Sequence, residues 1–570
     1  MKKLHIFALL LACTLAVGCS SSSDDPEIPV NPTPTPTPTP PTPTPGDQTA
    51  EELANYKCPT YSDNYTSVAA WTQRSKWNLA NMHDPTVVKA SDGYYYMYQT
   101  DASYGNAHQK DIRNSNKHGH FFCRRSKNLV DWEFVGATMV GLPSWVKTKL
   151  NEFRKGMGVA ERPDSYFAND LDFGFWAPCV RKVNDHLYRM YYAITCPGTI
   201  NGDGTWSERA FIGLMETSDP ASNKWEDKGY VITNASDKGL NFKVRSDDWA
   251  NCYFKYNAID PTYVITPEGK HWLIYGSWHS GFAAVELDAN TGKTKAALPN
   301  PWGTADDIAA YGKTIFTRTL NNRWQGSEAP EIVYHDGYYY LFVAYDALEV
   351  PYNTRVLRSK NVDGPYETMN GKITDAAKGA NEEPTVLTHP YKFSAGSGWV
   401  GISHCAVFDD GAGNWYYVSQ QRMPANVAGI AASNAIMMGG VRSIQWDSNG
   451  WPVVMPERYG AVPQATITAS ELEGTWEGIE LSYEYGKQKI SKTFKLSSNG
   501  VMEGGSAWSN VKAWSFDASS NTLTIGTTKL KVQREVDWEA SPRKVTIVYS
   551  GVSGNCLLYT SPSPRDMRRS

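Results

Sequence analysis

One sequence pattern recurs five times along the chain, and it constrains the fold more than any other feature. Each copy begins with Asp or Ala before a proline, or with a histidine. The chain then enters a short apolar stretch, turns through polar residues and returns through aromatic residues. The copies start 69 to 93 residues apart, at Asp84, Ala177, Asp260, Ala329 and His404. This period leaves room for two further strands per copy, and repeated four-stranded units are typical of propeller blades. We therefore predict an all-β chain with a five-bladed β-propeller.

Acidic residues stand at or beside the start of three copies. The innermost strand of each propeller blade borders a central channel, so residues at the same end of these strands converge on one point. Asp84, Asp260 and Glu328 would meet there, and His404 would join them from a further copy. One Asp-Pro pair alone is ordinary turn chemistry, but like charges gathered in a cleft indicate a functional site. The repeat therefore predicts a site at one end of the channel.

The charge balance of the chain argues against a nucleic acid partner. Its 570 residues include 55 Lys and Arg and 59 Asp and Glu, which gives a net charge of −4, and no basic face is evident. A chain of this length favours two or more domains. We assign residues 51–463 to the propeller and expect a monomer.

The N-terminal residues are typical of an exported protein. Residues 1–19, MKKLHIFALLLACTLAVGC, combine two lysines, an apolar run and small residues before Cys19, as a secretion signal does. LAVGC resembles a bacterial lipobox, which implies a lipid on Cys19 after cleavage. Residues 20–50 are rich in Ser, Pro and Thr, and their alternating prolines favour an extended spacer. We expect an outward-facing lipoprotein of the outer membrane or cell surface, in contact with the membrane only through its lipid.

The C-terminal residues predict a second β-domain. Residues 464–554 alternate apolar and polar residues between turn signals, as in a small antiparallel β-barrel or sandwich, and contain no catalytic constellation. We expect this domain to have a packing or glycan-contacting role. Residues 555–570 break the alternation and resemble a translated sequencing adapter, so we expect this tail not to be native.

Several short motifs carry a resemblance to a known family. They lie within about residues 75–460 and read HDPTV at 83–87, WAP at 176–178, NAIDPT at 257–262, YGSWHSG at 275–281, SEAP at 327–330, GPY at 364–366 and WDSNGWPVV at 446–454. With these motifs the chain resembles glycoside hydrolase family 43, whose members are five-bladed propellers, and in particular its arabinanase branch. The resemblance implies cleavage, with inversion, of internal α-1,5-L-arabinofuranosidic links in plant cell-wall arabinan or arabino-oligosaccharides.

The resemblance also implies roles for the gathered residues. Asp84 matches the general base, Glu328 the general acid, and Asp260 a third carboxylate that orients the acid and tunes its pKa. His404 matches the histidine that organises one central calcium ion through waters, although a single imidazole is weak evidence for a cation that prefers oxygen ligands.

Three further residues are candidate sugar contacts in the matching motifs. Asn257 lies in NAIDPT and Ser277 in YGSWHSG. Trp176 in WAP fits a stacking wall for the sugar and a core position equally well.

The chemistry of glycoside cleavage requires such a set independently of the resemblance. One carboxylic acid protonates the leaving oxygen, and in an inverting enzyme a second carboxylate, roughly 6.5–9.5 Å away, activates a water. A charged Asp260 beside Glu328 would raise the pKa of the acid. Glu331 competes for the acid role, but strand alternation places it out of phase with the inward-facing position.

The chain departs from the family pattern in two places, and other functions stay open. Cys179 follows WAP where an acid is usual, and an insertion near residues 102–170 enlarges the first blade and leaves the shape of the cleft undetermined. An exo-acting α-L-arabinofuranosidase or a β-xylosidase on the same fold is one alternative. A non-catalytic surface glycan-binding protein is the other, and the presence of both an acid and a base argues against it.

Overall fold

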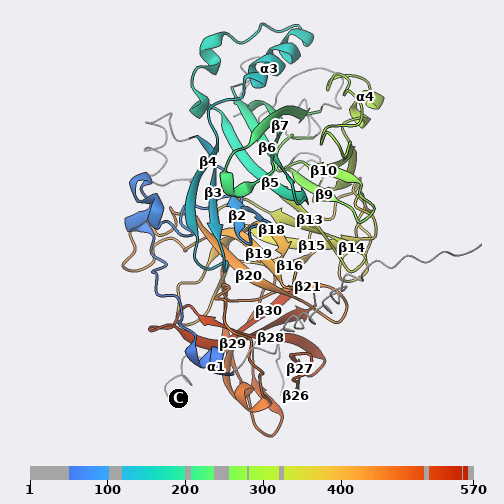
Figure 1. Ribbon diagram of the computed structural model, residues 1–570. Helices are drawn as coiled ribbons and strands as arrows, with labels where there is room; N and C mark the ends of the chain where they lie inside the picture. Colours follow the sequence, from blue (N-terminus) through green and yellow to red (C-terminus); the bar gives the residue numbers. More distant parts are fainter. Residues whose placement is uncertain are drawn as a thin grey trace, which may run out of the picture. The chain divides into compact units, whose positions relative to one another are not determined.

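The computed structural model describes residues 50–101, 119–198, 207–235, 256–278, 281–319, 326–505, 512–554 and 556–562 (Figure 1). The chain divides into two compact units, residues 1–44 and 45–570, and all described residues lie in the second. The predicted signal peptide, its lipid site Cys19 and the spacer as far as residue 49 lie outside the described residues.

Five antiparallel four-stranded units form the propeller, so the predicted all-β, five-bladed fold is confirmed (Figure 1). In chain order the blades are β1 (Thr86–Lys89), β2 (Tyr95–Tyr98), β3 (His120–Ser126) and β4 (Glu133–Met139); β5 (Gly174–Asn184), β6 (Leu187–Pro197), β7 (Ser207–Thr217) and β8 (Glu226–Thr233); β9 (Thr262–Ile265), β10 (His271–Tyr275), β11 (Phe282–Leu287) and β12 (Lys313–Phe316); β13 (Ser327–His335), β14 (Tyr338–Tyr345), β15 (Asn353–Ser359) and β16 (Thr385–Thr388); and β18 (Val400–Asp409), β19 (Trp415–Arg422), β20 (Met438–Trp446) and β21 (Pro452–Val454).

The innermost strands of the blades form a closed ring. Strand β1 contacts β5 and β18, β5 contacts β9, β9 contacts β13, and β13 contacts β18. Three of the other inner strands bond to the carboxylate of Glu331 in β13. It accepts two bonds of 2.7 Å from Arg181 of β5, one of 3.0 Å from the hydroxyl of Thr262 in β9, and one of 3.0 Å from the backbone N–H of Val407 in β18. The prediction that Glu331 lies out of phase is therefore wrong. A register shift between Glu328 and Glu331 in the β13–β14 pairing turns Glu331 into the channel.

Each copy of the sequence repeat begins with a residue in the left-handed region of φ. The five φ angles lie between 42° and 54°, at Asp84, Ala177, Asp260, Ala329 and His404. Residues with a Cβ adopt this conformation only where the surroundings hold it, and such residues cluster at functional sites. Neighbouring blades hold three of the backbone N–H groups: that of Asp84 donates to Gln420 Oε1 (3.0 Å), that of Ala177 to Thr100 Oγ1 (2.7 Å) and that of Ala329 to Asp260 Oδ2 (3.1 Å).

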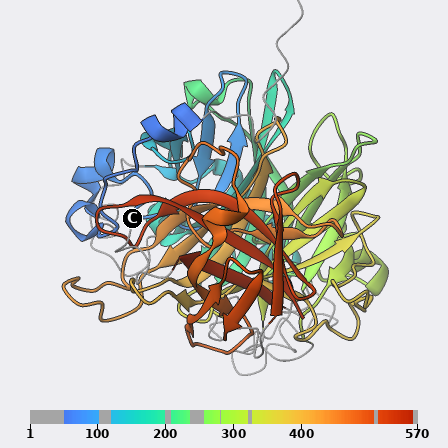
Figure 2. The ribbon, with the colours of Figure 1, turned by 90° about the horizontal axis from the view of Figure 1, so that it is seen from below.

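The C-terminal domain is a barrel and not a sandwich. Eight strands close on themselves, because β30 pairs with both β22 and β29. Figure 2 shows these strands from below, in orange and red. They are β22 (Gly474–Glu480), β24 (Lys492–Leu496), β25 (Val501–Gly504), β26 (Lys512–Asp517), β27 (Thr522–Ile525), β28 (Thr528–Asp537), β29 (Lys544–Ser553) and β30 (Cys556–Pro562).

The barrel continues past residue 554, where the sequence suggested that the domain ends. Leu557, Leu558 and Tyr559 of β30 are buried, and β30 also pairs with β16 in the fourth blade, next to which it lies in Figure 1. The non-native origin of residues 555–570 stays a prediction.

The helices in the described ranges are few and short, and they lie outside the sheets. They are α1 (Ala50–Asn55), α3 (Ser144–Gly156) and α4 (Ala305–Ala309), with the 3-10 turns η1 (Thr66–Val68), η2 (Trp71–Lys76), η3 (Asp164–Phe167), η4 (Asp170–Asp172), η5 (Pro220–Ser222) and η8 (Ala469–Leu472). None of the described helices is both long and apolar enough to cross a bilayer.

The predicted insertion near residues 102–170 spans parts of two blades. Residues 102–118 lie outside the described residues, β3 and β4 belong to the first blade, and α3 packs on the second blade. There Trp145 and Phe153 contact the ring of Phe211 in β7, with ring centroids 5.8 and 6.0 Å apart. The enlargement of the first blade stays a prediction.

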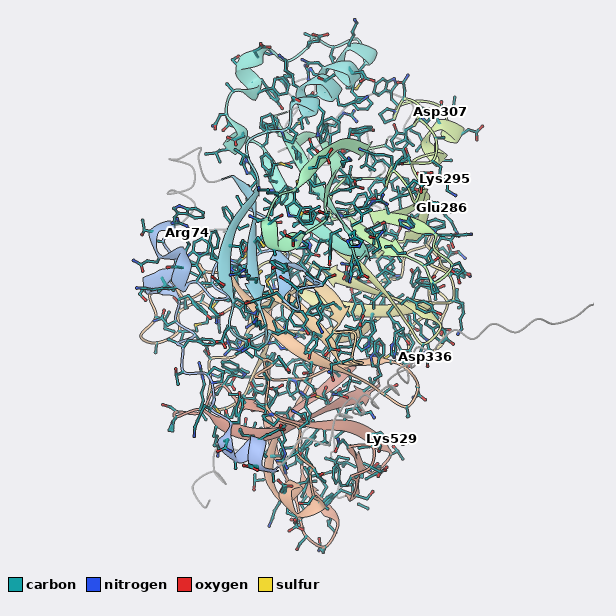
Figure 3. The ribbon with its side chains drawn as sticks, in the orientation of Figure 1. Arg74, Glu286, Lys295, Asp307, Asp336 and Lys529 are labelled. Atoms are coloured by element: carbon teal, nitrogen blue, oxygen red, sulfur yellow. The ribbon has the colours of Figure 1, made fainter. Side chains whose placement is uncertain are left out.

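Several charged side chains labelled in Figure 3, such as Arg74 and Asp307, lie at the periphery. Lys295 and Glu286 form an ion pair there, with Nζ and Oε1 2.7 Å apart. Exposed pairs of this kind contribute about 0–1 kcal/mol to stability. The buried charges at the channel are the ones that require an explanation.

Candidate active site

The repeat positions bring three carboxylates and one imidazole together at one end of the channel. Asp84 and Asp260 are buried and Glu328 is half-buried. The charges of Glu328 and Asp84 both act on Asp260, and all three carboxylates act on His404. The structure thus places Asp84, Asp260, Glu328 and His404 in a single electrostatic cluster.

Asp84 sits in a cationic, hydrogen-bonded setting. Its Oδ1 lies 2.8 Å from His404 Nδ1, and its Oδ2 accepts a bond of 2.7 Å from the hydroxyl of Thr100. Burial alone would raise the pKa of Asp84, but the charge of His404 and the hydrogen bonds from His404 and Thr100 hold this pKa well below its usual value. Asp84 is therefore an ionised carboxylate in a fixed orientation at neutral pH.

His404 carries the positive charge of the cluster. Burial opposes its protonation, but Asp84, Asp260 and Glu328 together raise the pKa of His404 to about 9. Next to it, burial lowers the pKa of His83 to about 4, so His83 is neutral. One imidazolium thus faces three acids.

Glu328 is held by three neutral donors. The hydroxyl of Tyr352 donates to Oε1 (2.6 Å), while the indole N–H of Trp278 (2.8 Å) and the hydroxyl of Ser277 (3.2 Å) donate to Oε2. A hydroxyl can donate to a carboxylate and can also accept from a carboxylic acid. This set can therefore hold Glu328 in both protonation states through which a general acid passes.

Asp260 has a different environment from the other two acids. Its Oδ2 accepts a bond from the backbone N–H of Ala329, the residue after Glu328. Burial, with the charges of Glu328 and Asp84 and against that of His404, raises the pKa of Asp260 to about 7. The structure thus places a raised pKa on Asp260, while the expected effect of Asp260 on the pKa of Glu328 stays a prediction.

The three predicted sugar contacts differ in the groups that they touch. Ser277 is buried against Glu328, whereas Asn257 is buried with its Oδ1 accepting a bond of 3.1 Å from Asn234 Nδ2. Trp176 is half-buried and packs on the core between the second and third blades. A Cβ on Gly174 would meet its ring at 2.5 Å, so glycine is required there.

The sequence did not single out Thr100, Trp278 and Tyr352. Trp278 lies inside the YGSWHSG motif, so the motif could have identified it as a site residue. Thr100 and Tyr352 lie outside the repeat starts, so neither periodicity nor a motif marks them.

The described residues fit only a largely hydrated calcium ion. Nowhere in the described ranges do three His, Cys, Asp or Glu side chains gather in a way that could hold a metal. Nδ1 of His404 is engaged by Asp84, and Glu331 in the channel is engaged by Arg181. Calcium prefers six to eight oxygen ligands, so water would have to supply most of them.

Comparison with known proteins assigns the fold to a family. The family model described as glycosyl hydrolases family 43 matches residues 79–452, more than half of the chain. The chain belongs to this family. A second model, described as a C-terminal lipocalin-like domain, matches residues 456–558. The chain is therefore a glycoside hydrolase, as the motifs implied.

Similar proteins in this family include two with different named activities. An extracellular endo-α-(1→5)-L-arabinanase of Thermotoga petrophila is 26% identical over 454 residues, which cover 76% of this chain and 83% of that protein. The extracellular exo-α-(1→5)-L-arabinofuranosidase ArbA of Cellvibrio japonicus is 26% identical over 385 residues, which cover 66% and 86%.

A crystal structure of an arabinanase shares the fold. The endo-1,5-α-L-arabinanase from Thermotoga petrophila superimposes with a TM-score of 0.62 at 22% identity, and the match covers 85% of this chain and 99% of that one. The fold therefore recurs in this crystal structure.

Proposed function

We propose that this family 43 enzyme cleaves internal α-1,5-L-arabinofuranosidic links of arabinan with inversion of the anomeric carbon. The observation that carries the proposal is the contrast between two acids of one site. Asp84 is paired with the His404 imidazolium, whereas Glu328 is held by neutral donors beside Asp260. Carboxyl groups in contrasting environments are what acid and base roles require.

Asp84 acts as the general base. Its depressed pKa keeps it ionised, and the bonds from His404 and Thr100 hold both of its oxygens. In the reaction it takes a proton from the attacking water as that water bonds to the anomeric carbon.

Glu328 acts as the general acid, and Asp260 orients it. Glu328 gives its proton to the glycosidic oxygen as the bond to the anomeric carbon breaks, so the departing sugar leaves as a neutral alcohol. Asp260 holds the backbone beside Glu328 through the N–H of Ala329. Glu328 in β13 is thus supported by Asp260, which lies two residues before β9.

The substrate assignment follows the named relatives and the matching motifs. Endo action is supported by the Thermotoga relative, and the exo alternative by the Cellvibrio relative, which is also 26% identical over a shorter match. A β-xylosidase is the third reading of the same cluster. Family membership favours all three over a non-catalytic glycan binder.

Early products from linear arabinan, branched arabinan and xylan distinguish these readings. Endo action predicts a mixture of arabino-oligosaccharides and a rapid fall in viscosity on linear arabinan. Arabinose as the sole early product would replace the endo assignment with the exo one, and xylose from xylan would indicate the xylosidase.

The cellular setting is part of the proposal. Relatives are named extracellular, and we extend this to a monomeric, outward-facing lipoprotein anchored through Cys19, in contact with plant arabinan or its oligosaccharides. Radioactive palmitate incorporation that is lost in Cys19→Ala would support the anchor.

The calcium ion implied by the resemblance is also a proposal, with His404 as the residue that would organise it and water as its main ligand. Elemental analysis of the purified enzyme should find about one calcium per chain, and dialysis against a chelator should lower activity until calcium is restored. A metal-free, fully active enzyme would leave His404 as the partner of Asp84 alone.

A further inference from the structure

A loop of the C-terminal barrel reaches the propeller beside the active-site blade. The loop joins β22 to β24 and contains β23 (Lys489–Ile490), which pairs in parallel with β17 (Tyr391–Lys392) of the propeller domain. The backbone N–H of Glu484 donates to His389 Nε2 (3.1 Å), and the Gln488 side chain donates to the carbonyl of Tyr391 (3.1 Å). The loop is therefore anchored on both sides of its tip.

Tyr483 in this loop bonds a buried propeller carboxylate. Its hydroxyl donates to Asp346 Oδ2 (2.8 Å), and its ring lies 4.7 Å from the Arg355 guanidinium. Burial, with the charge of Asp346, raises the pKa of Tyr483 above its usual value. The hydroxyl is thus a permanent donor to Asp346.

Asp346 is the centre of a buried polar network. It is 2% exposed and follows β14. Besides the Tyr483 hydroxyl, it accepts bonds from Arg318 Nη1 (2.7 Å, to Oδ1) and Asn353 Nδ2 (2.9 Å, to Oδ2). Buried charges are stabilised only where such donors hold them.

Arg318 and Asn353 connect Asp346 to the catalytic acid. Arg318 Nη1 also donates to the carbonyl of Gly326 (3.1 Å), two residues before Glu328. Asn353 follows Tyr352, whose hydroxyl donates to Glu328 Oε1. One route fixes the backbone of Glu328 and the other fixes its side chain.

We propose that Tyr483 of the C-terminal barrel is a positioning residue for Glu328, acting through Asp346. The inference rests on the proposed function only in taking Glu328 as the general acid. Without the hydroxyl, Oδ2 of Asp346 loses a charge-assisted bond in a buried site. Asp346 then rearranges, and Arg318 and Asn353 move with it. The barrel domain thereby contributes to acid catalysis without touching the substrate.

The test is Tyr483→Phe, which removes the hydroxyl and keeps the ring over Arg355. Tyr485→Phe is the matched control, since Tyr485 lies in the same loop and is 61% exposed. Each variant is assayed on an arabino-oligosaccharide and on the same oligosaccharide with a nitrophenyl leaving group. A nitrophenolate leaves without protonation, so its release depends little on the general acid.

We expect Tyr483→Phe to lower kcat about tenfold on the unmodified oligosaccharide and less than about twofold on the nitrophenyl substrate. KM should be unchanged on both substrates. The reason is that a displaced acid loses part of the roughly 10²–10⁴-fold that general acid–base catalysis contributes. Tyr485→Phe should match the wild type on both substrates.

Three results would overturn the inference. Equal losses on the two substrates would indicate a merely structural role, and no loss on either would indicate no role. A wild-type enzyme that cleaved neither substrate would refute the proposed function and the role of Glu328 with it. Thermal unfolding of each variant shows whether it is folded, and if Tyr483→Phe is not, Asp346→Asn should give the same dependence on the leaving group.

Discussion

Glu328→Gln lowers kcat on arabinan by a factor of roughly 10²–10⁴, which is the contribution of general acid–base catalysis. The amide keeps the shape of the side chain and its acceptor for the Tyr352 hydroxyl, but it has no proton to give. The same variant should lose much less activity on a nitrophenyl arabino-oligosaccharide, because that leaving group departs as an anion. Initial rates on the two substrates measure the difference.

The matched control is Glu349→Gln, the same change at an exposed glutamate in the loop after β14. This control should retain wild-type rates on both substrates. Near-full activity of Glu328→Gln on arabinan, in protein shown to be free of contaminating enzyme, would remove Glu328 from the acid role.

Asp84→Asn should lower kcat as much as Glu328→Gln does, but by the same factor for both leaving groups. The base activates water in every turnover, so the expected loss of roughly 10²–10⁴-fold applies to arabinan and to the nitrophenyl substrate alike. The amide also loses the ionic attraction to His404, whose Nδ1 lies 2.8 Å from the Asp84 carboxylate. Parallel assays of both substrates distinguish a lost base from a lost acid.

Asp306→Asn, at an exposed position in α4, is the control for this change and should leave the rates on both substrates unchanged. A loss in Asp84→Asn confined to the unmodified substrate would exchange the two roles.

The repeat made much of the site predictable. Asp84, Asp260 and His404 open copies of one pattern and share the left-handed φ that the blade starts impose, so their convergence followed from the period alone. Glu328 stands one residue before such a start. Sequence periodicity carries this information because every blade must present the same strand end to the channel.

Residues outside the period could not be found in this way. Thr100 and Tyr352 follow strands or lie in loops whose lengths differ between blades, and Tyr483 comes from another domain. Glu331 was misplaced because strand alternation assumes a regular ladder, whereas the β13–β14 pairing shifts its register before that residue.

The C-terminal domain shows a second limit of the sequence. Alternating apolar and polar residues occur in barrels and in sandwiches, since both bury one face of each strand. What decides between them is the pairing of β30 with β22 and β29, and the sequence places β30 in a segment that breaks the alternation.

The most direct test of the central claim is proton NMR of the first products formed from an α-linked arabino-oligosaccharide, recorded before mutarotation. If Asp84 activates a water that displaces the sugar protonated out by Glu328, the new reducing end first appears as the β-anomer. First appearance of the α-anomer would mean that Asp84 or another group forms a covalent intermediate with the sugar, and the single-displacement account would be wrong.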